Sequence, residues 1–173
     1  NLAELGADFY GANLHKWWCA PKGAGFLYAR PEVQPLVEPL IVSWGWQSEI
    51  PGPSQFIDYL QWTGTRDIAT YLTVPAAIEY QKEHDWSQVQ QRCHHLAAVT
   101  LDRIAQWSRV LPIYTPESDW FAQMAACPLP ASVDINWLKD HLYQDYHIEV
   151  PILQWENYRL ARVSFQAYND ETD

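Results

Sequence analysis

Lys16 is the residue of this sequence whose neighbours best suit covalent chemistry. It lies within the run NLHKWWCAPKGAG, which spans residues 13–25 and is rich in aromatic and small apolar residues. Such surroundings partly desolvate an amine and favour its neutral form, which is the nucleophile toward a carbonyl carbon. A lysine beside aromatic residues more often lays its aliphatic stem on them and keeps its ammonium in water. Taken alone, Lys16 is therefore only a candidate for a Schiff-base lysine.

The histidines and cysteines predict no metal site and no disulfide framework. Cys93, His94 and His95 are consecutive, so on a helix they would splay rather than converge on one ion. The three cysteines are odd in number and far apart, and none forms a CxxC pair. Such cysteine usage is typical of a reducing compartment, so we expect a cytoplasmic protein. Other histidines that lack ligand spacing are His84, His141 and His147.

The lysine run must be positioned by a loop-rich first part of the chain. The apolar run 23–29 predicts a buried strand. Five prolines within 31–53 break helices and central strands, and they predict a long irregular loop of the kind that is often functional. Residues 68–82 then predict a helix.

The second part of the chain predicts more regular elements. Asp85 is suited to cap a helix, because Gln88 follows three positions later and apolar residues then recur at helical spacing to about Trp107. The change of pattern near 82–86 predicts two domains, 1–83 and 84–173. The further elements expected are a helix over 137–146 and strands over 132–135, 148–153 and 159–165.

Composition and charge exclude several functional classes. Hydrophobic residues make up 48% of the chain and charged residues 18%, which is unlike the composition of disordered proteins. A formal net charge of -10 gives no general attraction to nucleic acid or anionic membranes. No apolar run approaches the roughly 18 residues that cross a bilayer, and no secretory signal is visible at the start. We therefore expect a soluble protein with neither nucleic acid nor membrane as partner.

Three sequence blocks carry a family resemblance. The first is GADFY at 6–10 together with the lysine run and FLY at 26–28; the second is WTGTRD at 62–67. The third is RVSFQAYN at 162–169. In their residues, order and rough spacing these blocks resemble the class V aminotransferases, and the nearest likeness is to isopenicillin N epimerase-like members. The resemblance spans nearly all of the chain.

The resemblance implies pyridoxal 5'-phosphate (PLP) as cofactor and a role for each matching residue. Lys16 would form the Schiff base with PLP and then move the Cα proton of an amino acid substrate. His15 and Asn13 would contact the PLP phosphate, although the family often has serine at the position of Asn13. Gly64 and Thr65 would reach the phosphate bound by the partner subunit, so the resemblance also implies a homodimer.

An arginine of the third block is implied to bind the substrate α-carboxylate. A guanidinium fork suits a carboxylate because it donates two parallel hydrogen bonds. Arg162 is the candidate, with Arg159 as the alternative. A surface ion pair is the commoner role of a single arginine, and only the motif favours substrate binding.

The resemblance further implies an α/β fold: the end of the large PLP-binding domain of fold type I, followed by a small α+β C-terminal domain. The match begins after the point where the family supplies the aspartate that pairs with the pyridine nitrogen, so we expect Asp8 to be structural. We therefore expect a fragment of a longer enzyme, or a chain whose N-terminal half is a separate polypeptide.

The expected reaction starts at the Cα of an amino acid and is of the aminotransferase or epimerase type. Cysteine desulfuration is disfavoured, because that mechanism needs a catalytic cysteine shortly before the arginine, and 140–162 contains none. An inactive fragment or pseudoenzyme that serves as a binding or assembly module is the alternative. Visible absorbance after addition of PLP separates these readings.

Overall fold

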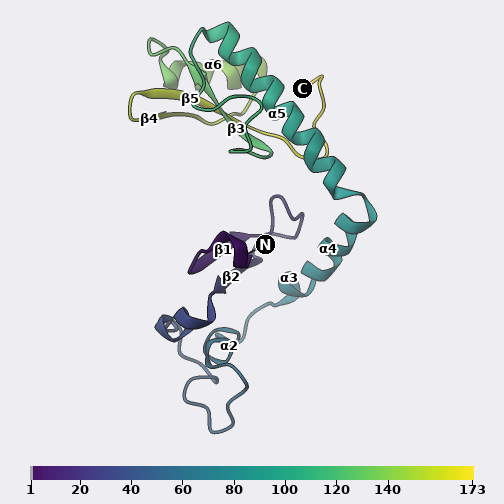
Figure 1. Cartoon of the computed structure of the whole chain (residues 1–173), viewed down its shortest axis with the longest axis vertical. Coiled ribbons are helices and arrows are strands. Elements are labelled where there is room, and N and C mark those ends of the chain that lie inside the picture. The colour runs from purple at the N-terminus through teal and green to yellow at the C-terminus, as the bar shows by residue number, and fades with distance from the viewer. Residues whose placement is uncertain (1) are drawn as a thin grey trace. The chain divides into compact units, whose positions relative to one another are not determined.

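The structure, a computed structural model, describes residues 2–173. The chain separates into two compact units between Lys82 and Glu83, and each is described by itself (Figure 1). Of the helices in the described part, none is both long and apolar enough to span a membrane.

The first unit is built around a two-stranded antiparallel hairpin. Strands β1 (Phe9–Asn13) and β2 (Gly25–Ala29) pair so that Asn13 lies opposite Gly25. Strand β2 confirms a strand within 23–29, but the predicted burial was wrong, because Phe26 and Leu27 are exposed and only Ala29 is buried. Strand β1 was not predicted. The other elements of this unit are α1 (Leu2–Leu5), the 3-10 helix η1 (Pro31–Leu36), α2 (Gln55–Leu60), α3 (Ala69–Leu72) and α4 (Val74–Glu83).

The helix predicted over 68–82 is interrupted. It forms as α3 and α4, with Thr73 between them. Pro75 has no N–H to donate and its ring clashes with the carbonyl four residues earlier, so α3 does not run on into α4. The predicted irregular segment 31–53 contains only η1, and α2 begins just beyond it with Ser54 as its cap, whose hydroxyl accepts from the Ile57 N–H at 3.3 Å.

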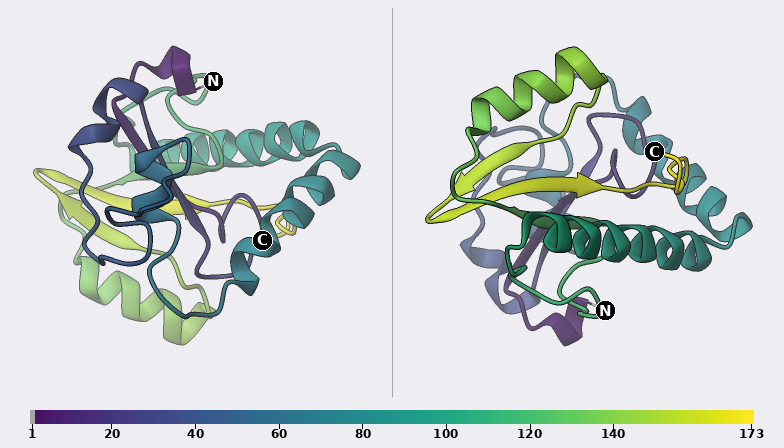
Figure 2. Two further views of the ribbon diagram at one scale, coloured as in Figure 1. Left: turned by 90° about the horizontal axis from the view of Figure 1, so that it is seen from below. Right: turned by 90° about the horizontal axis from the view of Figure 1, so that it is seen from above.

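The second unit packs two helices along a three-stranded antiparallel sheet. Its elements are α5 (Trp86–Ser108), β3 (Met124–Leu129), α6 (Ile135–Tyr146), β4 (Ile152–Trp155) and β5 (Tyr158–Ser164). The strand order is β3-β5-β4. Helix α5 runs along β3, and α6 runs along β4 (Figure 2).

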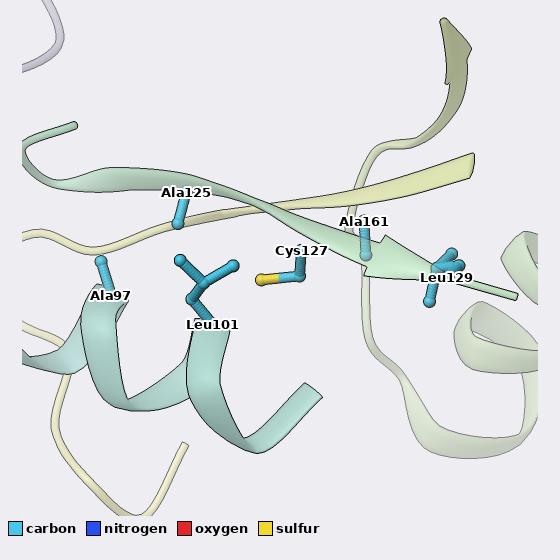
Figure 3. Close-up of a cluster of buried hydrophobic side chains, with 6 residues drawn as sticks. All are labelled: Ala97, Leu101, Ala125, Cys127, Leu129 and Ala161. Atoms are coloured by element: carbon cyan, nitrogen blue, oxygen red, sulfur yellow. The ribbon is translucent and has the colours of Figure 1, made fainter. Parts of the chain in front are cut away.

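The core of the second unit lies between α5 and the sheet. Ala97 and Leu101 of α5 point toward Ala125 and Cys127 of β3 (Figure 3). The buried face of α5 repeats at helical spacing, as its sequence predicts. Its members are Trp86, Cys93, Leu96, Ala97 and Leu101.

Three predictions in the second unit were wrong. Asp85 precedes α5 with a φ of 42°, and its side chain makes no capping hydrogen bond. The strand expected over 148–153 forms only as β4, which begins at Ile152. The strand expected over 132–135 does not form, because Asp134 instead caps α6 by accepting from the N–H groups of Asn136 and Trp137 at 2.9 and 3.1 Å. Strand β3 was not predicted. It contains Pro128, which cannot donate to a ladder, and this is tolerated because β3 is an edge strand of the sheet.

Candidate functional site

The segment that carries Lys16 is a loop fixed at both ends. We call residues 14–24, which join β1 to β2, the lysine loop. The Leu14 N–H donates to the Ala24 carbonyl at 3.0 Å, and the Ala20 N–H donates to the Leu14 carbonyl at 3.0 Å. These bonds close the base of the loop, so the residues between Leu14 and Ala20 form a tight excursion from the hairpin.

The base of the lysine loop is also packed against a helix. Leu14, Ala20 and Ala24 are buried together, and Val74 and Ala77 of α4 pack against them. Burial of this kind removes apolar surface from water and fixes the backbone that leads to Lys16. The base of the lysine loop is therefore held in place by the packing of the first unit.

The last residue of β1 and the first polar residues of the lysine loop lie outside that packing. Asn13 and Lys16 are exposed and His15 is half-buried, while Leu14 between them is buried. An amide, an imidazole and an amine thus stand within four consecutive residues at the end of β1. These groups can all donate hydrogen bonds to a phosphate, and the amine can also attack an aldehyde. The residues present fit PLP.

The predicted desolvation of Lys16 was wrong for the described chain. Lys16 is exposed, and the neighbouring Trp18 is itself 41% exposed. The apolar side chains that the sequence places around Lys16 divide between two directions: Leu14, Ala20 and Ala24 face α4, and Trp18 faces water. Proximity in sequence did not translate into burial of the amine.

Gly64 and Thr65 lie in the same unit, in the connection between α2 and α3. Gly64 has a φ of +105°, a conformation that a residue with a Cβ adopts only under strain. The connection continues into α3, whose Thr70 lies beside the lysine loop: a Cβ built on Gly23 would be 3.8 Å from the Thr70 methyl carbon. The second sequence block therefore leads into a helix that touches the lysine loop.

Arg162 lies in the second unit, on β5. It is exposed and lines a cavity of about 600 Å³. Arg159 is half-buried and donates instead to the Val133 carbonyl before α6. Of the two arginines, Arg162 lines this cavity and Arg159 does not.

Two further residues of that cavity were missed by sequence reasoning. His95 and Arg103 of α5 line it together with Arg162. Their spacing around Val99 places them on one stripe of the helix, and this periodicity was the available signal. Acidic residues also line the cavity, so its charge is mixed: Glu149, Asp170, Glu171 and Asp173.

The cysteines offer little reactivity in the described structure. Cys93 and Cys127 are buried, and burial raises the pKa of both thiols, that of Cys127 to about 12. Cys19 is exposed, yet partial desolvation raises its thiol pKa too. Across residues 2–173, no group of three or more His, Cys, Asp or Glu side chains is arranged to hold a metal ion.

Comparison with known proteins decides the family. The family model described as Aminotransferase class-V matches residues 1–173. The chain belongs to this family. Isopenicillin N epimerase of Amycolatopsis lactamdurans is 33% identical over 182 residues, which is 100% of this chain and 46% of that protein. A probable chloroplastic L-cysteine desulfhydrase of Arabidopsis thaliana is 29% identical over 197 residues, which is 100% of this chain and 39% of that protein.

The fold of this class V aminotransferase family chain is matched by a solved structure. The apo structure of a cysteine desulfurase from Thermococcus onnurineus NA1 superposes with a TM-score of 0.72 at 21% identity, over 99% of this chain and 45% of that chain. The α/β fold predicted from the resemblance, the end of a fold type I large domain and a small C-terminal domain, is confirmed.

The comparisons also confirm the predicted cofactor, since the class V family is PLP-dependent. The chain spans less than half the length of these relatives and corresponds to their C-terminal part. The relatives include an epimerase and a probable desulfhydrase, and one structural neighbour is a desulfurase, so the comparisons do not exclude desulfuration.

Proposed function

We propose that this chain carries the lysine and the substrate arginine of a PLP-dependent enzyme that acts at the Cα of an amino acid, of the aminotransferase or epimerase type. The observation that supports this most directly is the lysine loop. Its backbone is closed by two hydrogen bonds and its base is buried on α4, yet Asn13, His15 and Lys16 remain accessible at its surface. A rigid base under accessible polar groups is what a covalent cofactor site needs.

Each residue has a distinct task in this proposal. PLP, when bound, draws electrons away from the substrate Cα. Lys16 holds the cofactor covalently through its Nζ atom and, once released, takes and returns the Cα proton. Asn13 and His15 donate hydrogen bonds to the cofactor phosphate. Arg162 orients the substrate by binding its α-carboxylate through two parallel hydrogen bonds.

We also propose a homodimer, in which Gly64 and Thr65 reach the phosphate held by the partner subunit. The first unit has large apolar side chains on its surface, which supports a partner: Leu40, Trp44 and Ile50 of the loop before α2 are 103%, 88% and 89% exposed. Apolar surface on this scale marks interaction sites. Sedimentation of the purified chain tests the dimer, and a monomer at all concentrations contradicts it.

A second candidate reaction is β-elimination from a sulfur-containing amino acid. The match to a protein named as a probable L-cysteine desulfhydrase favours it. Removal of the Cα proton by Lys16 begins this reaction as well, so the residue roles stay the same. It also needs no nucleophilic thiol, in keeping with a Cys127 that is buried with a raised pKa.

The covalent role of Lys16 is tested with the purified chain and PLP. We expect a visible absorbance band, and after borohydride reduction a stable adduct located on Lys16 by peptide mass analysis. Lys16→Arg keeps the charge and removes the adduct. Lys22→Arg, in the same loop, is the matched control and retains it. Equal labelling of several lysines, or none, contradicts the proposal and favours a binding or assembly module without its own cofactor site.

A further inference from the structure

Gln81 makes a long-range contact with the residue that follows Lys16. Its side-chain Nε2 donates a hydrogen bond to the Trp17 carbonyl oxygen at 3.0 Å, and the two residues are 64 positions apart in sequence. The bond is part-buried, and both residues belong to the first unit. A hydrogen bond over such a separation ties the far end of α4 to the lysine loop.

The position of Gln81 on α4 continues the face that already packs under the loop. Val74, Ala77 and Gln81 follow one another at intervals of three and four, which places them on one side of the helix. The first two pack against the buried base of the loop. Gln81 reaches the tip of the lysine loop. One face of α4 therefore supports the base of this loop with apolar contacts and its tip with a hydrogen-bond donor.

The tip itself is a tight turn. The Cys19 N–H donates to the Lys16 carbonyl at 3.2 Å, and Cys19 has a φ of +58°. This bond closes the turn across Trp17 and Trp18, and the Trp17 carbonyl lies inside it. Because the Gln81 amide holds that carbonyl, it restrains the peptide plane between Trp17 and Trp18, inside the turn that begins at the Lys16 carbonyl.

We propose that Gln81 is a positioning residue for Lys16: its amide fixes the Trp17 carbonyl and thereby holds the turn from which Lys16 reaches the cofactor. This proposal rests on the proposed role of Lys16. Gln81 touches neither the cofactor nor the reacting atoms. Loss of its donor lets the turn sample other conformations, and the Lys16 amine then reaches the cofactor aldehyde less often.

Two substitutions remove the donor while keeping the size of the side chain. Gln81→Met has a similar length and no donor, and Gln81→Glu keeps the shape but only accepts hydrogen bonds. Gln91→Met, at an exposed position of α5, is the matched control. The main readout is the rate of PLP adduct formation at Lys16 divided by the rate at exposed Lys22 of the same loop, measured by borohydride trapping and peptide mass analysis.

We expect the ratio of adduct formation at Lys16 to that at Lys22 to fall about 2- to 10-fold in both Gln81 variants, because each variant loses the net free energy of one hydrogen bond. The ratio should stay unchanged in Gln91→Met. Amide hydrogen exchange at residues 17–20 of the cofactor-free chain should become faster in both variants. A merely structural role would lower the melting temperature and leave the ratio as it is in the wild type. An unchanged ratio therefore overturns the proposal.

The same experiment separates failure of this inference from failure of the proposed function. If the wild-type chain labels Lys16 and Lys22 equally, the proposed covalent role of Lys16 fails. The exchange data then decide whether Gln81 holds the turn: faster exchange confined to residues 17–20 supports that contact, and unchanged exchange overturns it.

Discussion

Arg159 and Arg162 are three residues apart on β5, so their side chains leave opposite faces of the strand. The Arg159 guanidinium has a structural role, because it donates a hydrogen bond to the Val133 carbonyl. Arg162 lines an open cavity. The alternation of side chains along β5 thus separates Arg162, the candidate from the sequence, from Arg159, the alternative.

These different tasks predict different effects of substitution. Arg159→Ala should lower the free energy of unfolding by about 1.5–3 kcal/mol, since it removes a charged donor from a backbone carbonyl. Arg162→Ala should leave stability nearly unchanged and weaken binding of an amino acid to the PLP-loaded chain roughly 10- to 100-fold. Denaturant titration and spectral titration measure the two quantities. The reverse assignment of effects would show that Arg159 is the substrate residue.

Much of the candidate site could be predicted from the sequence, because its residues are contiguous. Asn13, His15 and Lys16 lie within four consecutive residues, and a local motif is enough to find them. The exposure of Lys16 and the contact of Gln81 could not be predicted in this way. Both depend on which face of α4 packs under the loop, and that is a tertiary property.

At the scale of elements, the buried Cys127 thiol in the core between α5 and β3 makes the stability of the fold depend on pH. Burial raises the pKa of Cys127 from 9.0 to about 12. The folded state therefore keeps this proton over a pH range in which the unfolded chain releases it. The stability associated with Cys127 is fully present below pH 9.0 and is lost as the pH rises toward about 12.

We expect the free energy of unfolding to fall by up to ~1.4 kcal/mol for each pH unit above 9 on account of this thiol. In Cys127→Ala the stability at neutral pH is lower, because a cavity is left, but its decline between pH 9 and 11 is shallower. Urea denaturation at several pH values measures both slopes. Parallel slopes in the two proteins would mean that Cys127 does not titrate during unfolding in this range.

Sequence patterns predicted best the elements that have an apolar repeat sustained over many residues or a clear boundary. Helix α5 has a buried stripe over 23 residues and forms almost as predicted. Strands β1 and β3 contain Gly11 and Pro128, which weaken the signal of a strand. Their pairing with β2 and β5 outweighs local propensity, and such pairing is not visible in a single sequence.

At the scale of the whole molecule, the chain consists of two units with separate cores. The buried residues of the second unit's core come from α5, β3 and β5, and Leu138 of α6 and Ile152 of β4 are among the residues packed against them. We propose that the division between Lys82 and Glu83 is a true domain boundary, close to the predicted one between residues 83 and 84.

This proposal predicts that residues 83–173 fold without the first unit. Expressed alone, they should show helical circular dichroism and a single cooperative thermal transition, because their core does not draw on residues before 83. The full chain is the reference for the helical signal of α5 and α6. A gradual transition without cooperativity would mean that the second unit needs the first one.

The strand order β3-β5-β4 has a consequence for synthesis on the ribosome. Both other strands of the sheet pair only with β5, which ends at Ser164. No strand of this sheet can pair until β5 is being translated, and the pairing of β3 is complete only once Ser164 has been made, although α5 and β3 precede β5 in the chain. Until then a nascent chain carries the apolar face of α5 and an unpaired strand β3, so the second unit cannot complete its fold before β5 is translated.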